Sequence, residues 1–121
     1  MNRWMWTLLP AALALMIASP AAAHAQLERA VPAAGSAVRV SPPRLTLWFS
    51  PRLESAFGKI RVLNAKGDQV DHGDSQLDPA DARQLGVSLP RLAPGTYRVQ
   101  WRVLSVDTHV SEGQFTFDVR P

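Results

Sequence analysis

YRVQWRVLSVDTHVSEGQFTFDV, residues 97–119, reads as two β-strands joined by a polar turn. From residue 97 to residue 103 apolar and polar residues alternate, which is the period of a half-buried strand. The apolar members of this row are Tyr97, Val99, Trp101 and Val103. Leu104 and Val106 then interrupt the alternation, because they are apolar on the face that had been polar. We therefore expect a bulge or a local twist near residues 103–104.

The polar turn that follows carries the residues most able to bind a metal ion or to take part in a reaction. Ser105, Asp107 and His109 are spaced two apart, and residues two apart in an extended segment point to the same side. A carboxylate and an imidazole are thus expected to converge at the end of a strand. The alternative is a solvated pair on an exposed loop, where polar residues are common.

Several further segments alternate in the same way and are separated by Pro or Gly turns. They are residues 44–50, 59–64, 85–89 and 114–120, together with a short edge strand within 27–37. Residues 69–83 are polar and contain Pro79, so they are expected to be irregular. Six or seven short strands without a helical period predict an all-β fold. We expect a small, Ig-like Greek-key β-sandwich, with a closed barrel as the alternative.

The first 23 residues have the features of a secretory signal peptide. Arg3 is the positive charge, residues 8–17 are the apolar run, and Ala21–Ala23 form a small-residue cleavage site. The apolar run is shorter than the ~20 residues of a membrane-spanning helix. We therefore predict a periplasmic protein with one domain at residues 24–121. A cut after Ala25 also fits the small-residue pattern, and the pattern alone does not choose between the two.

The composition excludes several classes of protein and of site. The chain has no cysteine, so it has neither a disulfide framework nor a thiolate metal site. Its three methionines all lie within residues 1–23. The net charge of +3 is spread along the chain rather than clustered, which argues against nucleic acid and membrane surfaces as partners.

Cleavage after Ala23 would make His24 the first residue of the mature chain. Its free amine and ring nitrogen could then chelate one metal ion. With Asp107 and His109, this amine and imidazole form a nitrogen and oxygen donor set without sulfur, which suits Cu(II). Zinc and nickel remain possible by ligand chemistry alone. His72, in the sequence DHGD, is expected to be a solvated turn residue, with a weak accessory metal site as the alternative.

The sequence holds no recognisable catalytic motif. It has no Gly-rich phosphate loop, no G-x-S-x-G and no H-E-x-x-H. Ser105, Asp107 and His109 are the residue types of a hydrolase triad. On one strand, however, they would lie in a row, whereas a triad needs successive hydrogen bonds from nucleophile to base to orienting group. We therefore do not predict a hydrolase.

Motifs along the whole of residues 24–121 resemble the CopC family of periplasmic copper-resistance proteins. They are His24-Ala25, the Pro-Ala-Ala-Gly-Ser turn at 32–36, Leu-Thr-Leu-Trp-Phe-Ser at 45–50, Gly-Thr-Tyr-Arg-Val-Gln-Trp-Arg at 95–102, Ser-Val-Asp-Thr-His at 105–109 and Gly-Gln-Phe-Thr-Phe at 113–117. The resemblance implies a small Greek-key β-sandwich or barrel that binds one Cu(II) per chain through His24, Asp107 and His109. It also implies cleavage after Ala23.

The resemblance further implies copper sequestration or delivery, often beside a CopD-like inner-membrane protein, and we expect a monomer that is not an enzyme. The sequence departs from the family pattern in three places. Residues 65–76 lack the methionines that bind Cu(I) in some members, Pro51 replaces a frequent acidic residue, and Val110 replaces a frequent proline. The missing methionines put a Cu(I) site in doubt.

Two other functions remain open from the sequence. A histidine-brace copper monooxygenase also uses an N-terminal histidine, although a carboxylate ligand would occupy a position that oxygen activation needs open. A metal-free structural or interaction module is the other alternative. A mature chain beginning at Gln26 would exclude both copper functions.

Overall fold

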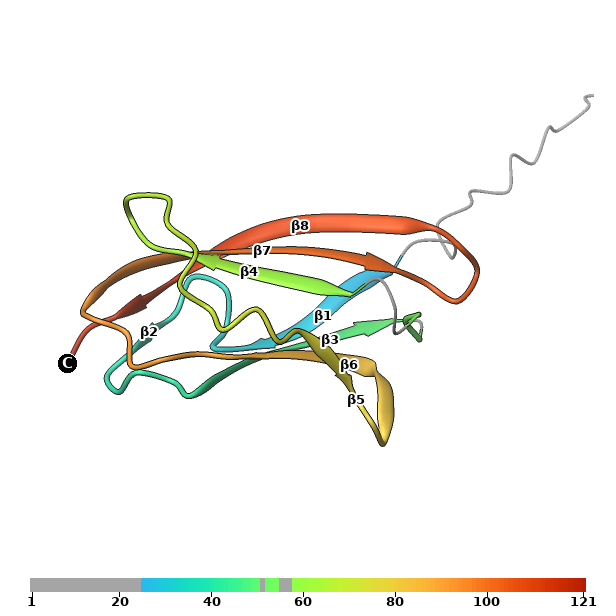
Figure 1. Ribbon diagram of the computed structural model, residues 1–121, viewed down its shortest axis with the longest axis horizontal. Coiled ribbons are helices and arrows are strands. Elements are labelled where there is room, and N and C mark those ends of the chain that lie inside the picture. The colour runs from blue at the N-terminus through green and yellow to red at the C-terminus, as the bar shows by residue number, and fades with distance from the viewer. Residues whose placement is uncertain (1–24, 51, 55–57) are drawn as a thin grey trace, which may run out of the picture.

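The structure is a computed structural model that describes residues 25–50, 52–54 and 58–121. These residues form eight β-strands and no helix, and so include no helix that could cross a membrane. The strands are β1 (Gln26–Val31), β2 (Ala37–Val38), β3 (Arg44–Ser50), β4 (Lys59–Leu63), β5 (Gln76–Asp78), β6 (Asp81–Ser88), β7 (Gly95–Leu104) and β8 (Val110–Val119). They form two layers (Figure 1).

Each layer of the sandwich is a four-stranded sheet. One has the order β1-β3-β6-β5 and the other β2-β8-β7-β4. Among the eight described strands, only β5–β6 and β7–β8 are hairpins between chain neighbours, and the other pairs of consecutive strands lie in different sheets. The predicted all-β sandwich is thereby confirmed, and two separate sheets replace the alternative of a closed barrel.

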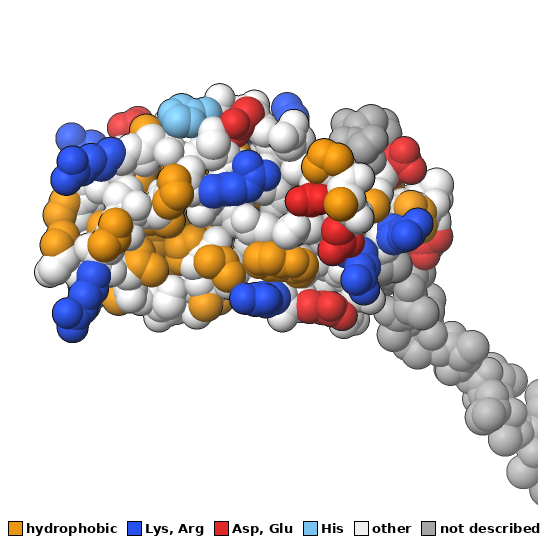
Figure 2. Space-filling model, turned by 90° about the horizontal axis from the view of Figure 1, so that it is seen from below, with side chains coloured by type: hydrophobic (Ala, Val, Ile, Leu, Met, Phe, Trp, Pro, Cys, Tyr) orange, Lys and Arg blue, Asp and Glu red, His pale blue; other side chains and the backbone are white. Residues whose placement is uncertain are grey.

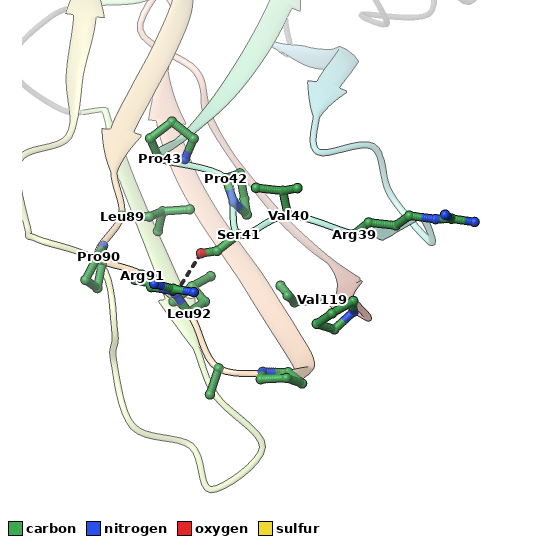
Figure 3. A pocket seen from close by; sticks show the side chains of 13 residues that line it. Arg39, Val40, Ser41, Pro42, Pro43, Leu89, Pro90, Arg91, Leu92 and Val119 are labelled. Atoms are coloured by element: carbon green, nitrogen blue, oxygen red, sulfur yellow. Dashed lines mark hydrogen bonds between the residues drawn. The ribbon is translucent and has the colours of Figure 1, made fainter.

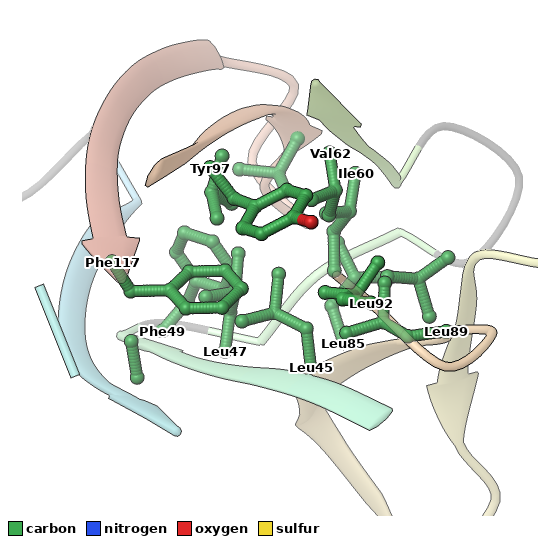
Figure 4. Packing of buried hydrophobic residues seen from close by; sticks show 14 of the residues in the cluster. Leu45, Leu47, Phe49, Ile60, Val62, Leu85, Leu89, Leu92, Tyr97 and Phe117 are labelled. Atoms are coloured by element: carbon green, nitrogen blue, oxygen red, sulfur yellow. The ribbon is translucent and has the colours of Figure 1, made fainter. Parts of the chain in front are cut away.

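The core lies between the sheets and consists of the inward residues of the alternating strands (Figure 4). Each large aliphatic or aromatic side chain buried here contributes about 1.5–3 kcal/mol to folding. Residues at most 2% exposed include Leu45, Leu47, Phe49, Ile60, Val62, Leu85, Val87, Val99 and Phe117. Trp101 lies at the core margin with its ring edge-on to Phe49, at 5.0 Å between centroids. Apolar packing thus holds a chain that has no disulfide.

The bulge expected near residues 103–104 is absent. β7 pairs with β8 in one unbroken register, from Gly95 opposite Val119 to Leu104 opposite Val110. The inward row simply continues through Val103 to Ser105, both of which are buried. The apparent break in the sequence pattern arises because half-buried Leu104 and exposed Val106 are apolar residues on the outer side of the strand.

The prediction that residues 69–83 are irregular is also partly wrong. β5 and the start of β6 lie within it and form an antiparallel hairpin at the edge of the first sheet. An edge hairpin gains its hydrogen bonds from the neighbouring strand β3 and needs few apolar residues of its own. A polar sequence can therefore be a strand at this position.

Backbone contacts bring three chain segments to one end of the sandwich. Gln26, at the start of β1, lies opposite Ser50, at the end of β3. Two residues later the Arg52 carbonyl accepts a hydrogen bond from Val106 N–H at 3.1 Å, and Leu53 forms a bridge with Ser105. The first described residues and the β7–β8 turn therefore occupy the same end (Figure 1).

Candidate metal centre

The β7–β8 connection is a tight turn closed by backbone hydrogen bonds. Ser105 N–H donates to the His109 carbonyl at 3.0 Å, and Thr108 N–H donates to the Ser105 carbonyl at 2.9 Å. Thr108 has a φ of 71°, in the left-handed region that β-branched residues rarely adopt. The residues at 105, 107 and 109 are therefore not spaced along an extended strand, because the chain reverses between them.

The turn brings Asp107 and His109 together as predicted, but by a chain reversal rather than by the extended spacing from which the prediction was made. Asp107 Oδ1 lies 3.5 Å from His109 Nδ1, and both side chains remain reachable by solvent, at 43% and 47% exposed. The hydrogen bond donated by the Ser105 hydroxyl lowers the pKa of the Asp107 carboxyl, and the nearby His109 lowers this pKa further. The carboxyl is thus held in the ionised form that a metal ion requires.

Ser105 is the residue whose role the sequence reasoning missed. It is the one polar residue that is fully buried in the described part of the chain, and its hydroxyl bonds to Asp107 Oδ1. The alternation from Tyr97 to Val103, continued by one step, places residue 105 inward and could have identified it. The bulge expected near residues 103–104 would have ended this alternation, so the inward position of residue 105 was not recognised.

A hydrogen bond from Ser105 to Asp107 and the 3.5 Å contact of Asp107 with His109 link the three side chains in a chain, which the sequence reasoning did not expect. Asp107 stands in the middle, between the hydroxyl and the imidazole. A triad needs the imidazole beside the hydroxyl, where it can take the proton from the nucleophile. The observed order gives a buried hydroxyl hydrogen-bonded to a carboxylate, which is an arrangement for orienting that carboxylate.

The third predicted ligand, His24, lies outside the described residues. The chain immediately after it is well packed, since Ala25 is 4% exposed and Gln26 begins β1. Within residues 25–50, 52–54 and 58–121, no group of three or more His, Asp and Glu side chains could hold a metal ion. The turn alone therefore offers two donors.

His72 lies in a loop whose polar atoms hold the loop in place. Its Nδ1 is 2.8 Å from Ser88 Oγ, and the same hydroxyl is 2.5 Å from Asp74 Oδ2. Asp74 Oδ1 accepts the Ser88 N–H at 2.8 Å, and these bonds lower the pKa of the Asp74 carboxyl. The described residues thus give His72 no set of donors for an accessory metal site.

A groove of about 780 Å³ (Figure 3) is lined by the connection between β6 and β7, so it lies at the end of the sandwich opposite the β7–β8 turn. Its walls are mostly proline and aliphatic residues, among them Pro42, Pro43, Leu89 and Pro90, and they include no carboxylate or imidazole side chain. Figure 2 shows apolar side chains gathered at this end, with Lys and Arg beside them. The groove therefore has no metal-binding chemistry.

Comparison with known proteins agrees with this fold and identifies a family. Residues 27–120 match the model of the CopC domain family. The chain is 37% identical to Protein YobA of Escherichia coli K12 over 81% of this chain and 80% of that protein. It is 36% identical to the copper resistance protein C of Escherichia coli, over 93% and 94% of the two chains.

A solved structure is also similar along most of the domain. The crystal structure of CopC from Methylosinus trichosporium OB3b has a TM-score of 0.76 and 37% sequence identity, and the match covers 81% of this chain and 95% of that one. The family-model match, residues 27–120, spans both sheets and the turn with Asp107 and His109. By sequence and by fold, the chain belongs to the CopC family.

Proposed function

We propose that this chain is a Cu(II)-binding protein of copper homeostasis and resistance, with copper as its cargo. The site consists of the amine and imidazole of His24, the Asp107 carboxylate and the His109 imidazole, and it takes one ion per chain. Residues 1–23 are a signal peptide, and residues 24–121 are the mature periplasmic domain. The protein sequesters or delivers copper and does not catalyse a reaction.

The observation that carries this proposal is the pairing of Asp107 and His109 at the end of the sandwich where β1 begins. Their facing atoms are 3.5 Å apart, and both side chains are solvent-accessible. Gln26, two residues after His24, is tied to this end through Ser50. Two extended residues span about 7 Å, so the proposal needs the start of β1 to lie within about that distance of the turn.

The donor types favour Cu(II) among divalent ions. Two imidazoles, an amine and a carboxylate form a nitrogen-rich tetragonal set, and copper is the tightest binder among the first-row divalent metals. Cu(I) prefers sulfur ligands, and the only methionines of this chain lie within residues 1–23. Membership of the CopC family supports the same metal, because relatives of this chain are named copper resistance proteins.

The proposal also covers partners and the absence of catalysis. A monomer that exchanges copper with a CopD-like inner-membrane protein fits a small domain whose described ligand pair is exposed at one end. The Asp107 carboxylate would fill a coordination position that a copper monooxygenase keeps open for oxygen. Binding is therefore favoured over oxidation.

The experiment that tests this function is the mass of the exported protein, followed by a Cu(II) titration with a competing chelator. We expect a chain that begins at His24 and binds one Cu(II) with nitrogen-rich ligation by electron paramagnetic resonance. A mature chain that begins at Gln26, or one that competes no better than a generic surface histidine, would contradict the proposal.

A further inference from the structure

Ser105 occupies an unusual position for a hydroxyl group. It ends the inward row of β7 and is 0% exposed, whereas Asp107 and His109 above it are close to half-exposed. Leu53, itself 3% exposed, forms a backbone bridge with it. The Ser105 hydroxyl is thus a fixed point of the core directly beneath a solvent-exposed turn.

All the hydrogen bonds of Ser105 within this turn are directed to the residues that follow it. The hydroxyl donates to Asp107 Oδ1, lies 3.2 Å from the His109 carbonyl as a second acceptor, and accepts the His109 N–H at 3.3 Å. Its backbone N–H donates to the His109 carbonyl at 3.0 Å, and its carbonyl accepts the Thr108 N–H. One buried residue therefore fixes both the side chain of Asp107 and the backbone of His109.

The conformation of the turn needs such a support. Thr108 has a left-handed backbone, which is costly for a β-branched residue and persists only where surrounding bonds enforce it. The Thr108 hydroxyl, which lies 2.5 Å from the Asp107 carbonyl, bonds only within the turn. Val106 N–H ties the start of the turn to the Arg52 carbonyl, and the contacts from Ser105 connect its later residues, Asp107 to His109, to the core.

From these contacts we propose that Ser105 is the positioning residue of the metal site, which rests on the proposed function. Its hydroxyl holds Asp107 Oδ1, so Oδ2 is the oxygen presented to Cu(II), and its bonds to the backbone of His109 fix the approach of the imidazole. Ser105 contacts no metal. It keeps the two ligands in one arrangement before the ion arrives, as hydrogen-bond partners of metal ligands commonly do.

The chain supplies a matched control in Ser111. This serine lies on β8 opposite Val103, and its Oγ is also shielded from solvent. Among the described residues its hydroxyl has no hydrogen-bond partner. Removal of the Ser111 hydroxyl therefore changes the same layer of the core without removing a bond to the turn.

The test compares S105A, S105T, S105V and S111A, prepared as the exported, processed protein. Loss of a bond to a metal ligand typically weakens metal binding 10- to 100-fold, so we expect S105A and S105V to bind Cu(II) about 10- to 100-fold more weakly. S105T keeps the hydroxyl and matches valine in shape, so it should bind within about 3-fold of the parent protein, as S111A should. Should S105A fail to fold, the S105T and S105V pair still isolates the hydroxyl.

Two spectroscopic readouts separate positioning from general stability. In metal-free S105V the amide signals of Thr108 and His109 should lose their protection from hydrogen exchange, while those of β3 and β6 keep it. With copper, S105V should give a heterogeneous paramagnetic resonance spectrum, while S105T keeps the parent spectrum. Equal affinities and spectra for S105V and S105T would overturn the role of Ser105.

H109A distinguishes this outcome from a failure of the proposed function. If H109A also binds Cu(II) as the parent does, the copper site itself is elsewhere, and both proposals are wrong. If H109A loses binding while S105V retains it, the site stands and only the positioning role of Ser105 is refuted.

Discussion

Two turns in the described part of the molecule each place an aspartate and a histidine beside a serine, and the order of the contacts among the three side chains differs. In the β7–β8 turn the Asp107 carboxylate stands between Ser105 and His109. At the loop before β5, the hydroxyl of Ser88, the last residue of β6, stands between His72 and Asp74 of the loop. The same three residue types thus produce two different structures.

The difference decides which donors a metal ion could use. Ser88 takes both oxygens of Asp74, one through its N–H and one through its hydroxyl, and it also contacts Nδ1 of His72. Both contacts of Asp107 use Oδ1 alone and leave carboxylate and imidazole side by side. The first arrangement fastens a loop to a strand, and the second presents a ligand pair.

The largest expected effect separates the two histidines. H109A should weaken Cu(II) binding by more than about 100-fold, because loss of a bond to a ligand alone costs up to that amount. H72A should leave the affinity unchanged, because His72 belongs to the loop structure. Competition titration with a chelator of known affinity measures both, and equal losses in the two variants would remove the distinction between the turns.

The second prediction concerns the two aspartates. D107N keeps the shape of the side chain but removes the negative charge of the donor, so Cu(II) affinity should fall by about 10-fold or more. D74N should leave copper binding intact and instead loosen the loop, seen as faster hydrogen exchange at Ser88 N–H. A copper defect in D74N equal to that in D107N would contradict the comparison.

A third prediction concerns stability. S88A removes the hydroxyl between His72 and Asp74 and should lower the free energy of unfolding by about 1 kcal/mol, the usual value of one hydrogen bond. The matched change S105A leaves a buried site without its polar contact to the turn and should cost about 1–2 kcal/mol. Urea unfolding measures both, and only S105A should also change copper affinity.

The smallest expected effect is on the pKa values of the two aspartates, each of which should respond only to loss of its own serine. Bonds from Ser105 and Ser88 lower the pKa values of Asp107 and Asp74 below the ordinary value of about 3.9. The stability that each contributes is complete above about pH 4 and is lost as the pH falls through the folded-state pKa. In the metal-free protein, S105A should raise only the pKa of Asp107, and S88A only that of Asp74. Carboxyl carbon chemical shifts measure both, and a shift of both pKa values in either variant would contradict the separation.

The sequence predicts much of this fold because its core strands alternate plainly. β3 is predicted to the residue, since Leu45, Leu47 and Phe49 alternate with polar positions and prolines bound the strand. β5 and the start of β6 were missed because an edge hairpin is held by pairing with its neighbour rather than by burial. Pairing of this kind leaves no periodicity in the sequence.

For the candidate site, the sequence predicted the contact of Asp107 with His109 but not the geometry of the turn. The spacing of Asp107 and His109 indicated a convergent pair, and their contact at 3.5 Å agrees with it. The buried anchor at Ser105 and the left-handed Thr108 depend on how the turn closes, which local propensity does not determine. His24 lies outside the described residues, so its part in the site stays a prediction.

One measurement tests the contrast between the two turns most directly. Cu(II) is paramagnetic and broadens the nuclear resonance signals of residues close to it, so one equivalent can be added to the isotope-labelled, exported protein. We predict that the amide signals of residues 105–110 and of the start of β1 disappear together, while those of residues 71–75 and Ser88 remain. Loss of the signals at 71–75, or survival of those at 107–109, would contradict the proposed site.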